Sequence, residues 1–254
     1  LIATVGTGGG LLFGFLALIS LIGLSELYKV VDVQNKILGL TGYLGAVVYY
    51  GILYTGQMQY MTLLTIAFLV VLMAVYVFSF PTFKAEQVMT VFFGVFYVAV
   101  MLSYVYQTRM LEDGAVAVWL IFLSSWGCDT CAYCAGMLLG KHRLAPVLSP
   151  KKSIEGAVGG VVGSALLGCI YAYFFGAKMD EVSNPMVACA VACAIAAVIS
   201  QIGDLAASAI KRNHNVKDYG NLIPGHGGIL DRFDSVIFTA PAVYWAVYLI
   251  NRFL

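Results

Sequence analysis

Residues 37–83 read ILGLTGYLGAVVYYGILYTGQMQYMTLLTIAFLVVLMAVYVFSFPTF, a run without a single Lys, Arg, Asp or Glu. A helix that crosses a bilayer needs about 20 predominantly apolar residues, so this run is long enough for two spans. The polar patch at 55–59 (Thr-Gly-Gln-Met-Gln) interrupts it, and we interpret that patch as the turn between the spans. The apolar residues are continuous rather than alternating, which favours helices over the strands of a membrane barrel.

The composition of the whole chain agrees with this interpretation. Hydrophobic residues make up 61% of the 254 residues and charged residues 11%, against about 45–50% and about 25% in an average soluble protein. A soluble core of this size could not hide so much apolar surface, which excludes soluble, disordered and disulfide-scaffold classes. We expect an all-α, polytopic membrane protein with about eight complete transmembrane helices plus a truncated first one in residues 1–5. The complete spans are predicted near 11–28, 37–54, 60–80, 88–107, 115–139, 156–175, 186–207 and 236–251.

The distribution of basic residues predicts the orientation. Placing the glycine turn 6–10 outside leaves three basic residues in the outer segments: Arg109, Lys178 and Arg252. The inner segments then carry the other eleven: Lys29, Lys36, Lys84, Lys141, Arg143, Lys151, Lys152, Lys211, Arg212, Lys217 and Arg232. Because cytoplasmic loops are enriched in Lys and Arg, we expect these inner loops to be cytoplasmic.

Two of these loops, residues 141–152 and 211–232, hold eight of the fourteen basic residues. Topology alone could explain the first loop. The second also carries His226, several glycines and interleaved carboxylates, which a topological signal does not need. Glycines let backbone amides approach an anion closely, and Lys and Arg neutralise phosphate charge. The second loop therefore predicts a phosphate-binding site.

Four carboxylates lie beside these cations. Asp129 and Asp204 fall inside or at the inner ends of apolar spans, where a charge costs at least about 2.5–3.5 kcal/mol and marks a functional candidate. Asp231 and Asp234 close the second loop. Oxygen ligands beside phosphate-binding cations are typical of a Mg²⁺ site, because Mg²⁺ takes one or two carboxylates and shares the phosphates of its substrate. The alternative is a set of structural ion pairs within the membrane.

Three motifs resemble one known family. Residues 208–234 read SAIKRNHNVKDYGNLIPGHGGILDRFD, residues 149–156 read SPKKSIEG, and Asp129-Thr130 precedes Ala132-Tyr133. These stretches resemble the signature motifs of the phosphatidate cytidylyltransferases (CDP-diacylglycerol synthases). The resemblance is close over residues 124–241 and extends to the first hundred residues only in hydropathy.

The resemblance implies an enzyme of the bacterial-type inner (plasma) membrane that condenses CTP with phosphatidate, giving CDP-diacylglycerol and pyrophosphate, with Mg²⁺ as cofactor on Asp204 and Asp231. It divides the chain into amino-terminal transmembrane helices, residues 1–113, and a catalytic region, residues 114–254, whose cytoplasmic loops are 140–155 and 208–235. The residues expected to take part in catalysis are Asp204, Asp231, Lys211 and Arg212. Those expected to contact substrate are Ser149, Lys151, Lys152, Ser153, Lys217, Asp218, His226, Arg232, Asp234 and Asp129.

Several alternatives stay open at this point. Ser149 and Ser153 could contact phosphate or only cap the next span, and Asp218 and Asp234 could orient cations. A CTP-dependent polyprenol kinase or an ether-lipid CDP synthase would share much of the chemistry, and an ion-coupled secondary transporter would also place aspartates in the membrane. The expected partners are CTP, phosphatidate and membrane lipid. We expect no nucleic acid to bind. A homodimer is allowed by the small-residue spacing at Gly156, Gly159, Gly160 and Gly163.

Overall fold

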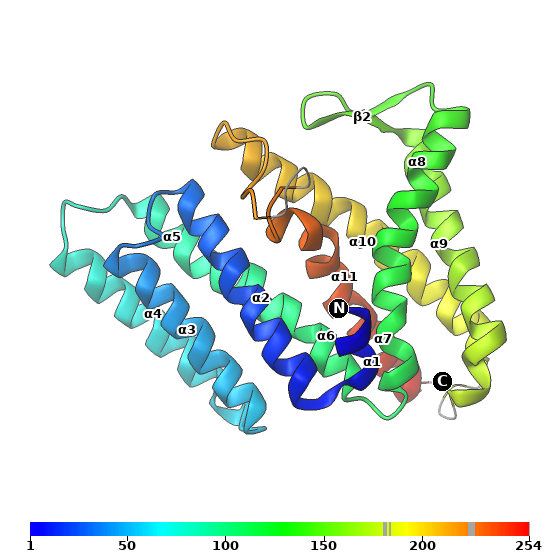
Figure 1. The fold of residues 1–254 in the computed structure, drawn as a ribbon, viewed down its shortest axis with the longest axis horizontal. Coiled ribbons are helices and arrows are strands. Elements are labelled where there is room, and N and C mark those ends of the chain that lie inside the picture. The colour runs from blue at the N-terminus through cyan, green and yellow to red at the C-terminus, as the bar shows by residue number, and fades with distance from the viewer. Residues whose placement is uncertain (180–181, 183, 223–226, 254) are drawn as a thin grey trace. The chain divides into compact units, whose positions relative to one another are not determined.

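The fold was obtained as a computed structural model that describes residues 1–179, 182, 184–222 and 227–253. The described chain is almost entirely helical (Figure 1). The α-helices are α1 (Ile2–Thr7), α2 (Gly9–Val30), α3 (Ile37–Tyr54), α4 (Met61–Phe78), α5 (Ala85–Gly94), α6 (Met101–Arg109), α7 (Gly114–Phe122), α8 (Cys128–Leu139), α9 (Ile154–Phe175), α10 (Pro185–Asn213) and α11 (Leu230–Phe253). Short 3₁₀ turns are η1 (Met58–Tyr60) and η4 (Gly176–Lys178), and π-helical turns are η2 (Val95–Val100) and η3 (Leu123–Gly127).

Seven helical segments of the described residues are long and apolar enough to cross a membrane by length and composition. They are Gly9–Val30, Ile37–Tyr54, Met58–Phe78, Ala85–Arg109, Gly114–Leu139, Ile154–Lys178 and Pro185–Asn213. Each coincides with a predicted span, and the break predicted at 55–59 separates α3 from α4. The eighth predicted span, 236–251, falls within α11, which is not among the seven. The all-α, polytopic membrane class is confirmed.

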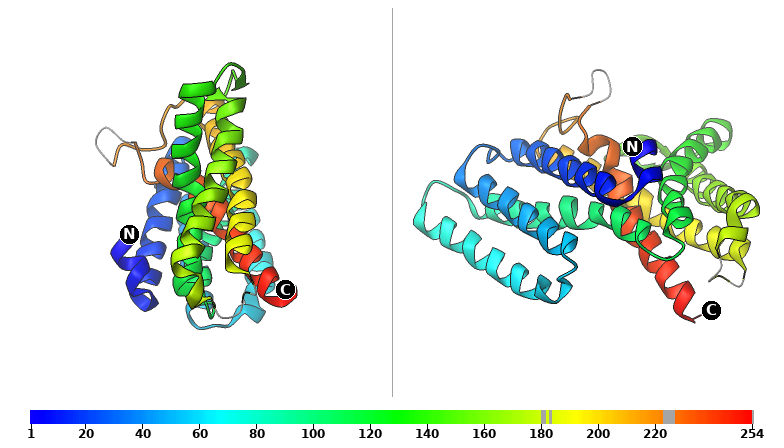
Figure 2. Two further views of the ribbon diagram at one scale, coloured as in Figure 1. Left: turned by 90° about the vertical axis from the view of Figure 1, so that its right-hand side faces the viewer. Right: turned by 60° about the horizontal axis from the view of Figure 1, so that its bottom comes forward.

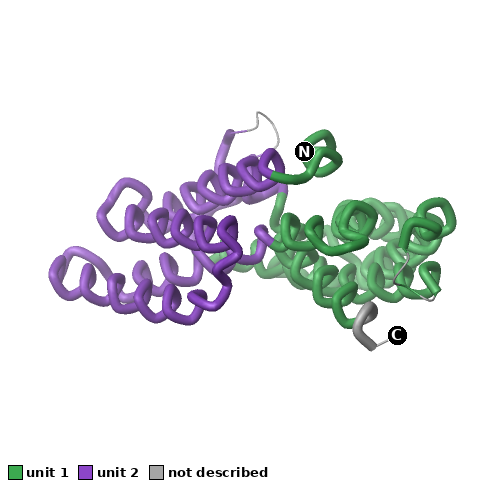
Figure 3. Tube along the Cα trace, turned by 90° about the horizontal axis from the view of Figure 1, so that it is seen from below, with its two compact units in different colours: residues 1–9, 104–213, 233–254 green, residues 10–103, 214–232 purple. Residues whose placement is uncertain are grey.

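The chain forms two compact units (Figure 3). Unit 1 comprises Leu1–Gly9, Tyr104–Asn213 and Phe233–Leu254, and unit 2 comprises Gly10–Ser103 and His214–Arg232. Each unit is therefore assembled from segments distant in sequence. The predicted division into a region before 113 and a catalytic region after it concerns function, and it stays a prediction.

Unit 2 is built on α2 to α5, with α3 and α4 side by side as an antiparallel pair (Figures 1 and 2). Its centre is Tyr28, fully buried on α2, whose hydroxyl donates to the carbonyl of Val91 at 3.1 Å. Ser20 and Tyr50 share a second buried hydrogen bond of 2.7 Å. Polar groups inside an apolar bundle are costly unless paired, so these bonds fix the register of α2 against its neighbours.

Unit 1 contains the helix bundle α8, α9 and α10 (Figures 1 and 2). The helices α8 and α9 approach closely because Gly159 lies directly against the Cβ of Ala135, leaving no room for a side chain. The same face of α9 brings Gly163 against Cys131. The small-residue spacing on α9 therefore serves packing within the chain, as expected where backbones must meet in a membrane.

A β-hairpin joins α8 to α9, where the sequence suggested only a loop within 140–155. Strands β1 (Arg143–Ala145) and β2 (Ser149–Ser153) pair antiparallel, with Arg143 opposite Ser153. Glu155 closes the base of the hairpin: one of its oxygens accepts the backbone N–H groups of Lys141 and His142, and the other pairs with the His142 ring at 2.6 Å. These bonds position the lysines of β2 relative to the ends of α8 and α9.

Candidate functional site

Unit 1 contains a cavity of about 420 Å³ between the hairpin and the helices α8, α9 and α10. Its polar lining residues are Asp129, Ser149, Lys151, Lys152, Ser153, Gln201 and Asp204. Its other lining residues are Ala132, Tyr133, Gly136, Met137, Leu144, Gly156 and Ala157. A volume of this order is typical of small-molecule sites, which span about 300–1,000 Å³. One cavity thus presents charged groups and apolar surface together.

The charge of the cavity centres on one ion pair. Lys152 on β2 donates from its Nζ to Oδ2 of Asp204 on α10, and both side chains are half-buried. Lys151, the next residue, is exposed at the cavity wall. The sequence placed all three residues at the site, and the structure brings them to one cavity.

Two further carboxylates lie near this pair. Asp129 on α8 and Asp234 on α11 each lie close enough to Asp204 to feel its charge. Ser235 hydrogen-bonds to Asp129 and also shares a buried 2.7 Å bond with Ser125. Neighbouring carboxylates repel one another when they are ionised, and nearby cations offset this repulsion.

Two cations of unit 1 lie near these carboxylates. Lys152 faces Asp129 as well as Asp204, and Lys211 on the last turn of α10 acts on Asp234. Arg212, the next residue of α10, is exposed. The cluster therefore combines residues that the sequence assigned to catalysis and to substrate contact.

Two further side chains shape the cavity. Ser153 is the N-cap of α9, and its Oγ accepts the backbone N–H of Gly156 at 3.1 Å. Ser153 therefore caps α9 in the structure. It also lines the cavity, so its contact with phosphate stays a prediction. Gln201, which the sequence did not single out, donates to the carbonyl of Ala157 at 2.9 Å and ties α10 to α9. Its position one turn before Asp204 is the signal that could have found it.

Unit 2 contains the other half of the predicted signature. Asp231 lies in the first turn of α11, and its Oδ2 accepts the backbone N–H groups of Tyr219 at 2.8 Å and Gly228 at 3.0 Å. Lys217 and Asp218 are exposed on the same segment, and so is Arg232 on α11. His226 lies outside the described residues. The loop predicted at 208–235 is shorter in the structure, because α10 continues to Asn213 and α11 begins at Leu230.

Glu26 on α2 is a site residue that the sequence reasoning missed. It is 8% exposed, and its two carboxylate oxygens accept the backbone N–H groups of Ile229 at 2.9 Å and Leu230 at 2.8 Å. Its signal was available, since it is a carboxylate within the predicted span 11–28.

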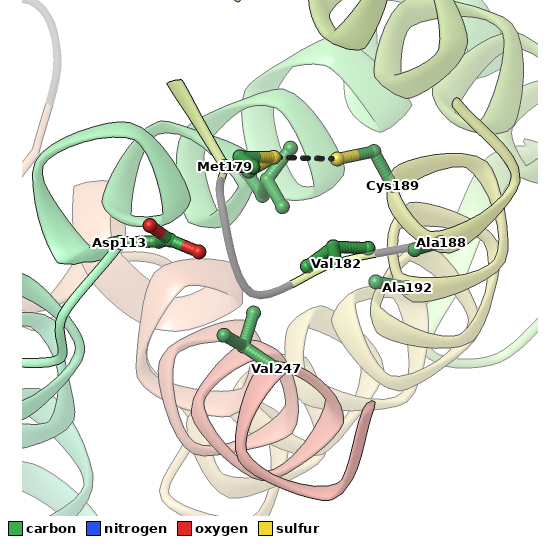
Figure 4. A pocket seen from close by; sticks show the side chains of 8 residues that line it. Asp113, Met179, Val182, Ala188, Cys189, Ala192 and Val247 are labelled. Atoms are coloured by element: carbon green, nitrogen blue, oxygen red, sulfur yellow. Dashed lines mark hydrogen bonds between the residues drawn. The ribbon is translucent and has the colours of Figure 1, made fainter. Parts of the chain in front are cut away.

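A second cavity of unit 1 is much smaller, about 20 Å³ (Figure 4). It is lined by Asp113, Leu120, Met179, Val182, Ala188, Cys189, Ala192 and Val247. The sulfur atoms of Met179 and Cys189 lie 3.7 Å apart across it. This volume holds about one water molecule, and none of its lining residues is cationic, so it is not a phosphate site.

The carboxylates of unit 1 suit the coordination that Mg²⁺ prefers. Within the described residues, no three His, Cys, Asp or Glu side chains come together as a metal-binding group. Mg²⁺ seldom uses such a cage, because it keeps waters and takes one or two carboxylates plus substrate phosphates. Asp204, with two further carboxylates near it, fits that pattern.

The fold and this cavity define the class as an integral membrane protein with a charged, ligand-sized site. The chain belongs to the cytidylyltransferase family, whose model matches residues 1–250. It is similar to the phosphatidate cytidylyltransferase of Staphylococcus haemolyticus, with 34% identity over 241 residues that cover 92% of this chain and 88% of the relative. The Bacillus subtilis phosphatidate cytidylyltransferase is 31% identical over 246 residues, 93% of this chain and 90% of its own. The Synechocystis sp. protein of the same name is 42% identical over 137 residues, 54% of this chain and 45% of its own.

Proposed function

We propose that this chain is a nucleotidyltransferase that transfers the cytidylyl group of CTP to phosphatidate, giving CDP-diacylglycerol and pyrophosphate. The observation that carries the proposal is the cavity with the Lys152–Asp204 pair in a chain of the cytidylyltransferase family. The names of the similar proteins favour phosphatidate as acceptor over a polyprenol, and they give a transporter no support.

In this reaction a phosphate oxygen of phosphatidate attacks the α-phosphorus of CTP. The bond from that phosphorus to the oxygen bridging the α- and β-phosphates breaks, and pyrophosphate leaves. The nucleophile is already anionic at pH 7, so the main obstacle is repulsion between two highly charged phosphates. Clamping and positioning by cations therefore supply most of the acceleration.

Cationic side chains of the described residues can reduce the repulsion between the two phosphates. Lys151 and Lys152 line the cavity and would neutralise phosphate oxygens, and the ion pair with Asp204 holds Lys152 in place. Lys211, Arg212, Lys217 and Arg232 are the further predicted phosphate contacts. Because the hairpin is closed by Glu155, its lysines are presented without first ordering a loop.

Mg²⁺ is the proposed cofactor, with Asp204 and Asp231 as its predicted ligands. When bound, it would neutralise charge on the CTP phosphates and stabilise the leaving pyrophosphate. Asp129 and Asp234 lie near Asp204 and would adjust the charge around it. The remaining cations would then hold the lipid phosphate in line for attack.

The apolar part of the lining suits the lipid substrate. Met137 and Leu144 line the same cavity as the lysines, so an acyl chain and a phosphate could occupy it together. We propose that phosphatidate enters sideways from the bilayer while CTP arrives from the cytoplasm, at a bacterial-type inner membrane. The charge bias of the loops supports the cytoplasmic side for CTP entry.

The deciding experiment uses the purified full chain in lipid nanodiscs, with CTP and Mg²⁺ and with either phosphatidate or a polyprenol as acceptor. The proposal expects equal release of CDP-diacylglycerol and pyrophosphate with phosphatidate alone. Phosphorylation of the polyprenol, with CDP released, would show a kinase instead. The oligomeric state in the same nanodiscs would test the predicted homodimer.

A further inference from the structure

We infer that Glu26 is a positioning residue: through bonds to the backbone at the start of α11, it fixes the turn that carries Asp231. The inference rests on the proposed function, because it concerns the presentation of a predicted site residue. Glu26, Asp231 and the backbone groups that they bond all belong to unit 2.

The geometry of Glu26 is that of a cap supplied by another helix. Its two oxygens each accept one N–H, from Ile229 and from Leu230, across 203 and 204 residues of sequence. The first N–H groups of a helix have no partner within it, and an anion there also interacts favourably with the helix dipole. A carboxylate that bonds both groups therefore sets where α11 begins.

Asp231 completes the arrangement from the other side. Its Oδ2 accepts the N–H groups of Tyr219 and Gly228, so two carboxylates together hold four backbone donors of the segments flanking residues 223–226. The charges of Glu26 and Asp231 also act on each other. Two nearby anions repel, and the hydrogen bonds that both accept from the backbone offset this repulsion.

The glycines of the signature fit around Glu26. A Cβ built on Gly220 would lie 2.5 Å from Oε1 of Glu26, and one on Gly228 would overlap Oε2. Neither glycine has a positive φ, so the close approach to Glu26 explains them rather than backbone strain. Two of the glycines that suggested a phosphate loop thus make room for a carboxylate of α2.

The burial of Glu26 supports a specific role. A carboxylate within an apolar span is expensive, and here it is 8% exposed on a helix whose one other charged residue is Lys29. A purely topological charge would be at the surface. The neighbouring Lys29 acts on Glu26 but does not replace its two backbone contacts.

The test compares Glu26→Gln, Glu26→Asp and Gly228→Ala with the wild type. Glutamine offers one acceptor and places an NH₂ against a backbone donor, aspartate keeps both oxygens on a shorter stem, and alanine at 228 displaces Glu26 from the partner side. Glu86→Gln is the matched control, because Glu86 is an exposed carboxylate in the first turn of α5.

Hydrogen exchange of the substrate-free protein is measured first. In Glu26→Gln and Gly228→Ala, amides of 219–222 and 227–231 should lose about tenfold in protection while the rest of unit 2 stays protected. Per folded molecule, kcat should fall about ten- to hundredfold, and half-maximal activity should need more Mg²⁺. Glu26→Asp should recover part of both effects, and Glu86→Gln should change neither.

Unchanged exchange in these segments would overturn the inference. So would a uniform loss of protection or of folded protein with normal kcat and Mg²⁺ dependence in the remainder, because that is the result of a merely structural role. A wild-type protein without activity would overturn the proposed function instead. The exchange measurement, which needs no substrate, would still decide whether Glu26 holds this turn.

Discussion

Lys152 and Asp204, 52 residues apart in sequence, form an ion pair whose side chains are 28% and 26% exposed. The chain contains a second Lys–Asp pair, Lys36 with Asp32, whose side chains are 43% and 86% exposed. Exposed pairs contribute little to stability, about 0–1 kcal/mol. Both pairs join a Lys to an Asp, but they differ in solvent exposure. The exposed Lys36–Asp32 pair therefore serves as the control for the half-buried Lys152–Asp204 pair.

Replacing Lys152 by Gln should lower kcat/KM about ten- to hundredfold, because one charge-assisted phosphate contact is worth about 1.5–3 kcal/mol. Steady-state kinetics with CTP and phosphatidate in nanodiscs would measure it. Lys36→Gln should leave kcat/KM within about twofold of the wild type, since Lys36 does not line the cavity and its exposed pair contributes little to stability. Equal activity of both variants would mean that Lys152 has only a structural or topological role.

Asp204→Asn and Asp231→Asn should each leave a folded, extractable protein whose kcat is lower by about hundredfold or more, similar to the loss of one preorganised transition-state contact. Asn keeps the size of Asp, and its amide oxygen can still accept two hydrogen bonds, so folding should survive. The Mg²⁺ concentration for half-maximal activity should rise, because Mg²⁺ affinity depends on carboxylate charge.

The control for these aspartates is Asp113→Asn, since Asp113 lines the small cavity that has no cationic residue in its lining. Its kinetics and Mg²⁺ dependence should match those of the wild type. Near-normal turnover of Asp204→Asn at low Mg²⁺ would refute the metal role of that residue. Misfolding of both Asn variants would favour structural ion pairs instead.

Gly159→Ala should destabilise the protein by about 1–3 kcal/mol, because the added methyl group meets the Cβ of Ala135 on α8. The thermal midpoint in detergent measures the change. Combining it with Ala135→Gly should recover most of the loss, and such coupling identifies a direct contact. Gly51→Ala is the control, since a Cβ there meets nothing within 4 Å. Additive effects of the two changes would contradict the predicted contact.

Cysteine labelling should show that the two ends of α10 lie on opposite sides of the membrane. The helix has 29 residues and is therefore about 43 Å long, enough to cross a hydrocarbon core of about 30 Å. In a background without the six native cysteines, an impermeant maleimide added to intact cells should label Asn184→Cys but not Asn213→Cys. The reverse pattern would place the basic loops outside and remove the route for CTP.

The spans and the charged cavity could be predicted from sequence for a simple physical reason. Hydropathy is summed over contiguous residues, so the break at 55–59 and the ends of α3 and α4 are visible without any tertiary information. The functional candidates Asp129 and Asp204 were visible for the same reason, because a charge in a long apolar run needs a partner.

Features that depend on long-range pairing could not be predicted. The β-hairpin 143–153 is closed by Glu155, whose partners lie on the far side of the hairpin. Glu26 contacts residues more than two hundred positions away, so its place in a predicted span could mark it as a candidate but could not identify its partners. A local pattern of apolar and polar residues predicts which residues lie in the membrane. The hydrogen bonds of Glu155 and Glu26 depend instead on the tertiary packing of separate segments.

The π-helical turn η3, Leu123–Gly127, lies in the middle of the segment Gly114–Leu139. A π turn accommodates one extra residue, so it rotates everything beyond it by about a quarter turn relative to an uninterrupted helix of 3.6 residues per turn. Before it, α7 is buried on nearly all sides; after it, α8 turns Asp129 and Tyr133 toward the cavity. The segment therefore has two consecutive parts: α7, which is packed in the bundle, and α8, whose rotation about the helix axis is set by the π turn. Deleting one residue from 123–127 would rotate α8 and carry Asp129 away from the cavity, while the hydropathy profile would stay unchanged.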